Sequence, residues 1–71
     1  MRKVAKSKNH HHIIPRSRNG KTNDENIAIV LKSKHCLYHG LFGNMLPREI
    51  IHYLNSYFWN GNYTITVKRN R

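Results

Sequence analysis

Two short stretches near the start of the chain have the pattern of strands. Residues 26–31 are β-branched and apolar, and residues 10–14 form a short stretch that ends at Pro15. Residues 16–25 between them are polar, with the turn pair Asn19-Gly20. The pattern therefore predicts a strand, a loop and a second strand.

The apolar spacing changes to that of helices in the middle of the chain. Ser33 is expected to cap a helix over about residues 34–42, and Gly43 with the following Asn is expected to end it. Pro47 suits the first turn of a second helix. One face of that helix is apolar, formed by Ile50, Ile51, Leu54, Tyr57 and Phe58.

The last part of the chain alternates apolar and polar side chains over residues 63–67, which predicts a short final strand. We therefore expect an α+β protein, with a basic arm over residues 1–9 and one domain over residues 10–71. Within it, residues 10–43 form the strand–strand–helix unit, and residues 44–71 add a helix and a short strand. The apolar helix face covers the first unit or, where it is in surplus, pairs two copies as a homodimer.

Charge narrows the class of partner. Thirteen Lys and Arg residues stand against three acidic ones in 71 residues, a formal net charge of +10. A polyanion is the expected partner, and nucleic acid is the commonest, although ribosomal and membrane-surface proteins are equally basic. The single cysteine excludes an intramolecular disulfide and a Cys-x-x-Cys zinc site. We find neither a secretory signal nor a membrane-length apolar run, and expect a cytoplasmic protein.

Histidines provide the candidate chemistry. The chain has six, and five of them lie in two groups, His10-His11-His12 and the pair His35 and His39. Residues four apart project from one face of a helix, so the pair can hold one metal ion. Either group alone is a weak signal.

Their order along the chain is more specific. His11-His12-Ile13-Ile14-Pro15 is followed by Asn26 at the start of the next strand, and then by His-x-x-x-His in a helix. This succession resembles the HNH endonucleases, and its spacing resembles that of the nuclease domains of DNase colicins. The resemblance covers roughly residues 9–43 and implies a ββα-metal core.

The resemblance also implies a role for each residue. His12 corresponds to the general base, and an imidazole can accept a proton from water near neutral pH. His11, His35 and His39 correspond to ligands of a divalent metal ion. Asn26 corresponds to the central Asn of the family, whose side-chain amide would bridge backbone groups and keep His12 oriented.

Two features of this sequence depart from the simplest version of that arrangement. Neighbouring side chains in a regular strand point to opposite faces, so His11 and His12 can serve one site only through a bulge or irregular backbone. The same alternation leaves His10 as a substitute for either. Many family members also carry Gly where this chain has Asn19, and Asn tolerates the left-handed conformation that such a position needs.

The metal and the nucleic-acid contacts are less determined. Three imidazoles suit Zn, Ni or Mn better than Mg, although the family works with several divalent ions. Arg16 and Arg18 flank the predicted site and are candidates to bind the scissile phosphate, with Arg16 also assigned to catalysis. The remaining basic candidates for nucleic-acid contact are Lys21, Lys32 and Lys34.

The sequence thus predicts a metal-dependent endonuclease that hydrolyses DNA phosphodiester bonds. The alternative is a catalytically silent protein of the same fold that binds nucleic acid or inhibits another nuclease. Stand-alone proteins of this family are often encoded by phages or mobile elements, so the resemblance implies such an origin.

Overall fold

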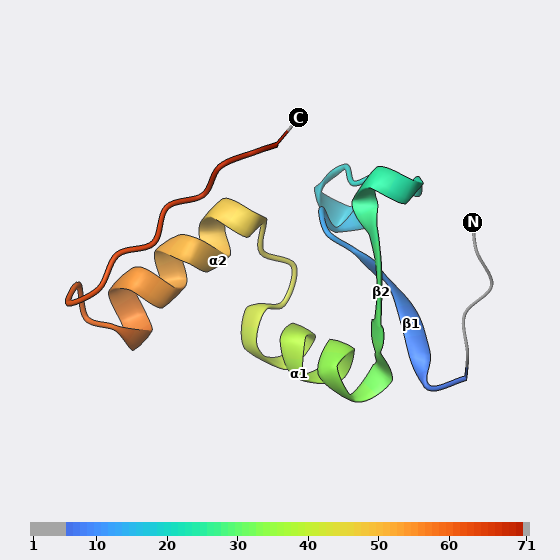
Figure 1. The fold of residues 1–71 in the computed structure, drawn as a ribbon, viewed down its shortest axis with the longest axis horizontal. Coiled ribbons are helices and arrows are strands. Elements are labelled where there is room, and N and C mark those ends of the chain that lie inside the picture. The colour runs from blue at the N-terminus through green and yellow to red at the C-terminus, as the bar shows by residue number, and fades with distance from the viewer. Residues whose placement is uncertain (1–5, 71) are drawn as a thin grey trace.

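The computed structural model describes residues 6–70, which form an α+β arrangement of a two-stranded antiparallel sheet and two helices. The strands are β1 (Lys8–His12) and β2 (Ile27–Leu31), and the helices are α1 (Lys32–Phe42) and α2 (Pro47–Tyr53). In Figure 1, α1 lies beside the hairpin, α2 follows beyond α1, and the C-terminal segment runs back along α2. The predicted α+β class is confirmed at this level.

The hairpin begins earlier than the sequence pattern predicts. The pairing of β1 with β2 is regular from Lys8 to His12, so the predicted first strand, residues 10–14, lies two residues too late. Lys8 and Asn9, assigned to the basic arm, instead belong to β1 because β2 is long enough to pair with them. Residues 1–5 of that arm lie outside the described residues.

One side chain ends the hairpin ladder. The N–H of Ile13 still donates to the backbone oxygen of Asn26 (2.9 Å), as a strand residue would. The next N–H, of Ile14, donates instead to Oδ1 of the Asn26 side chain (2.8 Å). At Ile14 a bond to a side chain thus replaces the backbone pairing of the two strands, and the chain leaves the sheet before it reaches Pro15.

The loop after β1 turns tightly on itself. The N–H groups of Arg18 and Gly20 both donate to the backbone oxygen of Pro15 (2.8 and 2.9 Å). Asn19 has a φ of 71° and adopts the left-handed conformation that the sequence predicted it would tolerate. Gly20 is required for another reason, because a Cβ at that position would collide with the carbonyl of Ile14.

Helix α1 starts directly from β2, and the predicted start at residue 34 is wrong. Ser33 lies inside the helix and does not cap it. The N–H of Lys32 donates to the backbone oxygen of Ser7 (2.8 Å), so the segment before β1 satisfies the first turn. The predicted end is confirmed: Gly43 has a positive φ of 55°, and its N–H donates to the oxygen of His39.

The second helix begins at Pro47, as predicted, and changes its winding partway. The carboxylate of Glu49 accepts a hydrogen bond from the N–H of Leu46 (2.8 Å), which satisfies the N-terminus. From Leu54 the chain forms a π-helical turn (Leu54–Phe58), whose wider winding rotates later side chains away from the α-helical stripe. The predicted apolar face therefore holds at Ile50, which is 9% exposed, and fails at Tyr57, which is 70% exposed.

The predicted final strand over residues 63–67 is wrong. The structure gives this segment no strand within residues 6–70, and β1 and β2 pair only with each other. The side chain of Asn55 takes the place of a strand partner: its Nδ2 donates to the oxygen of Ile65 (2.7 Å), and its Oδ1 accepts from the N–H of Ile65 (2.9 Å). The alternating side chains consequently remain exposed, including Tyr63, Ile65 and Val67.

Little apolar surface is buried in the described part of the chain. Ile50 on α2 is the buried aliphatic side chain among residues 6–70, whereas Leu37 and Leu41 on α1 are exposed. No helix among residues 6–70 has the length and apolar character needed to cross a membrane. Hydrogen bonds from side chains to backbone therefore carry an unusual share of the organisation.

Candidate metal centre

Three histidines from two elements, β1 and α1, converge in the structure. His11 lies on β1, and His35 and His39 lie one turn apart on α1. One ring nitrogen from each lies within 4.8 Å of the corresponding nitrogens of the other two. These are the three residues that the sequence predicts as metal ligands, and the structure brings all three together.

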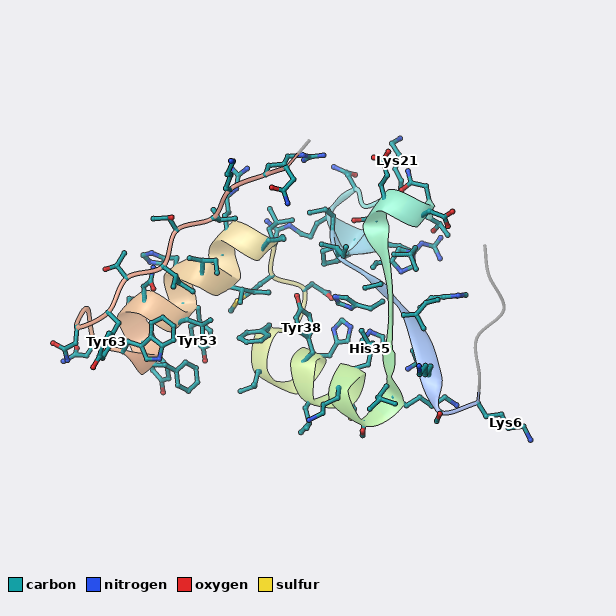
Figure 2. The ribbon with its side chains drawn as sticks, in the orientation of Figure 1. Lys6, Lys21, His35, Tyr38, Tyr53 and Tyr63 are labelled. Carbon is teal, nitrogen blue, oxygen red and sulfur yellow. The ribbon has the colours of Figure 1, made fainter. Side chains whose placement is uncertain are left out.

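The packing of β1 against α1 explains this convergence. Asn9 and His11 are two residues apart on β1, so they share the face toward α1. The ring of His11 meets the rings of His35, Tyr38 and His39 edge-on, with centroid distances of 5.0, 4.5 and 5.7 Å. Figure 2 shows His35 and Tyr38 projecting from one side of α1.

His11 is the buried member of the cluster. It is 8% exposed, and its Nδ1 has no hydrogen-bond partner among residues 6–70. A buried polar atom without a partner costs about 1–3 kcal/mol, so such an atom needs a compensating interaction. A metal ion held by the three rings is one group that these residues fit, because an imidazole nitrogen is a good ligand for divalent ions.

Electrostatics favours the uncharged rings that metal binding needs. Burial lowers the pKa of His11, and the neighbouring His35, His39 and His12 lower it further. Burial likewise lowers the pKa of His35, with contributions from His39 and His12. Both rings are thereby biased toward the neutral form, which is the form that can ligate.

His12 reaches the same site from the other face of β1. The pairing with β2 is regular through His11 and His12, so the expected bulge between them is wrong. His12 is instead the last residue of β1, next to the loop. His12 there lines an open pocket of about 290 Å³, together with His10, Pro15, Arg16, Ser17, His35, His39 and Asn44.

Thr22 is a contact of His12 that the sequence did not reveal. Its hydroxyl lies 2.9 Å from Nε2 of His12, across ten residues of loop. When Nε2–H donates to Thr22, Nδ1 of His12 carries the lone pair and can accept a proton. A threonine in a polar loop gives no local signal for such a contact, because the loop path decides it.

Asn26 holds the loop that carries Thr22. Its Nδ2 donates to the backbone oxygens of Ile14 (3.0 Å) and Lys21 (2.9 Å), while Oδ1 accepts from the N–H of Ile14. Its own N–H donates to Asn23, so its backbone and side-chain amides are all engaged. The side-chain amide bridges backbone groups as the sequence predicted, and it fixes both ends of the loop.

The predicted phosphate-binding residues do not form one patch. Arg16 lines the histidine pocket. Arg18 is already engaged: its guanidinium donates to both carboxylate oxygens of Glu49 (2.9 and 3.1 Å) and to the oxygen of Asn44 (3.3 Å). That pair is absent from the sequence prediction, because no local pattern joins a loop to a helix 31 residues away.

The lysines lie at the two ends of the hairpin. Lys21 belongs to the loop, whereas Lys32 and Lys34 lie at the start of α1, where β2 ends. Figure 2 shows this separation with Lys21 at one end of the hairpin and Lys6 at the other. All three predicted lysines are exposed.

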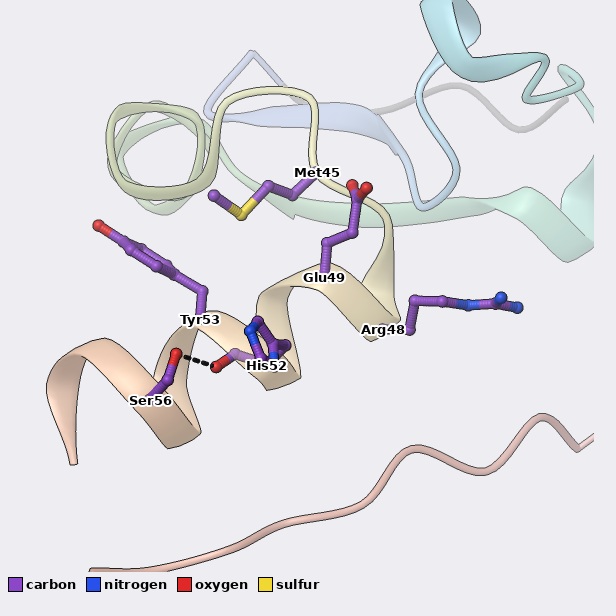
Figure 3. A pocket seen from close by; sticks show the side chains of 6 residues that line it. All are labelled: Met45, Arg48, Glu49, His52, Tyr53 and Ser56. Atoms are coloured by element: carbon purple, nitrogen blue, oxygen red, sulfur yellow. Dashed lines mark hydrogen bonds between the residues drawn. The ribbon is translucent and has the colours of Figure 1, made fainter. Parts of the chain in front are cut away.

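A second hollow, of about 620 Å³, lies along α2 and contains no comparable constellation. In Figure 3, Met45 and Tyr53 point toward α1, while Arg48 points away from them. Glu49 is paired with Arg18, and the Ser56 hydroxyl donates to the backbone oxygen of His52 (2.8 Å). Two of its polar side chains, Glu49 and Ser56, are thus engaged within the protein.

Comparison with known proteins adds no assignment: no family model, no curated protein and no solved structure matches the chain.

Proposed function

We propose that this protein is a metal-dependent endonuclease of the HNH type, which hydrolyses DNA phosphodiester bonds. The observation that carries the proposal is the convergence of His11 with His35 and His39 beside His12. The antiparallel hairpin followed by a helix, with histidines at the end of the first strand and inside the helix, is consistent with a ββα-metal core. Neither the net charge nor the number of histidines explains why the histidines occur in this succession along the hairpin and the helix.

His11, His35 and His39 are the residues proposed to hold a divalent ion. Three neutral imidazoles favour Zn, Ni or Mn over Mg. A bound ion would supply Lewis acidity toward phosphate and leaving oxygens. The buried, unpartnered Nδ1 of His11 supports the fit.

His12 is the proposed general base. With Nε2 held by Thr22, its Nδ1 is the atom that would take a proton from the attacking water. Asn26 acts as a positioning residue, because its amide holds the backbone on both sides of the loop that presents Thr22. A fixed imidazole is needed because general-base catalysis depends on hydrogen-bonding reach.

Arg16 is the proposed phosphate contact at the site, since it lines the pocket with His12. Lys21, Lys32 and Lys34 would bind the DNA backbone on either side. We exclude Arg18 from this role because Glu49 occupies its guanidinium. Phosphate contacts release counterions, so affinity for DNA should fall steeply with salt.

The test is plasmid nicking by chelator-treated protein re-supplied with Mg, Mn, Ni or Zn. Metal-dependent nicking that falls at least about 100-fold in His12→Ala supports the assignment, since general-base catalysis contributes roughly 10²–10⁴-fold. His52→Ala is the matched control, because His52 is an exposed histidine on α2. Wild-type protein that shifts DNA in a gel and cuts it with none of the metals would refute the nuclease and favour the silent DNA-binding alternative.

A further inference from the structure

The hydrogen bonds that link the histidine cluster to its neighbours run in one direction. Nδ1 of His39 lies 3.1 Å from the oxygen of Gly43, and a carbonyl oxygen can only accept. His39 therefore carries its proton on Nδ1, which leaves Nε2 with a lone pair. That Nε2 lies 2.9 Å from Nε2 of His35, so His35 must donate.

The same logic extends to Asn9. If the neutral His35 ring carries its proton on Nε2, its Nδ1 is an acceptor. Nδ2 of Asn9 lies 3.1 Å from that Nδ1 and is a donor. The chain of donors thus runs from Asn9 to His35, from His35 to His39, and from His39 to Gly43, with every contact satisfied.

This arrangement favours metal binding by His39 and opposes metal binding by His35. His39 already presents a lone pair at Nε2, as a metal ligand must. His35 presents a proton there. To ligate through Nε2 it must lose that proton and gain one at Nδ1, with no net change in charge. The new Nδ1–H then faces the Nδ2 of Asn9, which cannot accept it.

We propose that Asn9 is a positioning residue that sets the ring tautomer of His35, and that its side-chain amide turns over to present Oδ1 when a metal ion binds. The inference rests on the proposed metal centre and names a residue outside the resemblance-based site. Asn9 holds His35 through a single hydrogen bond, so turning the amide exchanges donor for acceptor without moving β1. Groups in this position, bonded to the second nitrogen of a ligating histidine, commonly change metal affinity by roughly 10–100-fold.

Two substitutions separate this role from a packing role. Asn9→Asp keeps the size of the side chain and offers only acceptors, so it should favour the ligating tautomer and raise Zn²⁺ affinity about tenfold. Asn9→Leu keeps the bulk and removes the hydrogen bond, so it should lower the affinity. Asn44→Asp is the charge control, because Asn44 also lines the histidine pocket, whereas Nδ1 of His35 bonds to Asn9.

The measurements are competition titration with Zn²⁺ and ¹⁵N NMR of the histidine rings, made on the full chain at one pH. We expect His35 to carry its proton on Nε2 in the metal-free wild type, and on Nδ1 in the zinc-bound protein and in metal-free Asn9→Asp. Equal zinc affinities in wild type, Asn9→Asp and Asn9→Leu, or an Nδ1 proton on metal-free wild-type His35, would overturn the inference alone. If the ¹⁵N signals of the histidine rings in the wild-type protein do not change when zinc is added, the proposed metal centre is overturned as well.

Discussion

The two halves of the molecule, residues 6–43 and residues 44–70, each use an asparagine side chain to hold a segment of backbone. In the first half, the Asn26 amide pairs with both the N–H and the oxygen of Ile14, and in the second half the Asn55 amide pairs in the same way with Ile65. Each side-chain amide bonds to the N–H and to the oxygen of one residue, as a neighbouring strand would, and we call this pair of bonds a clasp. The Asn26 clasp is part-buried and has a third bond to Lys21, whereas the Asn55 clasp is exposed.

The two clasps also differ in what lies beside them. The Asn26 clasp fixes a loop beside the histidine cluster, where a small displacement would separate His12 from the three proposed ligands. The Asn55 clasp fixes the C-terminal segment on the π-helical turn that follows α2, where Tyr63 and Val67 remain exposed. A small protein with little buried apolar surface thus places its most complete polar network next to its candidate chemistry.

Removing the Asn26 clasp should have the largest effect. Asn26→Ala leaves the N–H of Ile14 and two backbone oxygens without partners, and we expect a loss of roughly 2–3 kcal/mol in the free energy of unfolding. Urea denaturation measures this loss. A loss below about 1 kcal/mol would mean that the loop does not depend on the clasp.

Metal binding should stabilise the first half selectively. A ligand present at 100 times its Kd adds about 2.7 kcal/mol to the stability of the state that binds it. Amide hydrogen exchange with and without Zn²⁺ should show stronger protection in β1 and α1 than in residues 60–70. His35→Ala should lose the effect and His52→Ala should keep it. Equal protection in both halves would contradict a local site.

Removing the Asn55 clasp should cost less. Asn55→Ala gives up two exposed hydrogen bonds that water can replace, so we expect a loss below about 1 kcal/mol. Hydrogen exchange at Ile65 should nevertheless become faster, while exchange at Ile14 should not change. A loss equal to that of Asn26→Ala would remove the distinction between the two clasps.

The ion pair that ties the halves together should give the smallest effect. Hydrogen bonds from Arg18 lower the pKa of Glu49 below its ordinary 4.5. The pair therefore stabilises the fold above pH 4.5, and that stability is lost as pH falls through the lowered pKa. Glu49→Gln should be slightly less stable than wild type at pH 7, and the difference should shrink as pH falls through the lowered pKa of Glu49. The effect is small because both side chains are about 40% exposed. A difference in stability that persists in acid would mean that the substitution acts through packing and not through the ion pair.

Local periodicity was enough to predict much of the candidate site. A two-residue repeat on a strand and a four-residue repeat on a helix place His11, His35 and His39 on facing surfaces. The same two-residue repeat, counted back from His11, would have pointed to Asn9. Thr22 offered no such signal, since its contact with His12 depends on the path of a loop that Asn26 closes.

The second half was harder to predict for a related reason. Apolar spacing describes an α-helix as far as Tyr53, but nothing in that spacing indicates that the turn over Leu54–Phe58 would widen. The alternating residues 63–67 suit a strand, but a strand needs a partner at the edge of a sheet. Ile65 bonds instead to the side chain of Asn55.

The backbone at Gly20 has an evolutionary consequence. No side chain fits there, because a Cβ would enter the carbonyl of Ile14, whereas Asn19 needs only tolerance of a left-handed φ. Selection on descendants of this chain should therefore allow Asn or Gly at position 19 and only Gly at position 20. The spacing of Pro15, Gly20 and Asn26 should therefore persist in descendants of this chain, because each position has a backbone role.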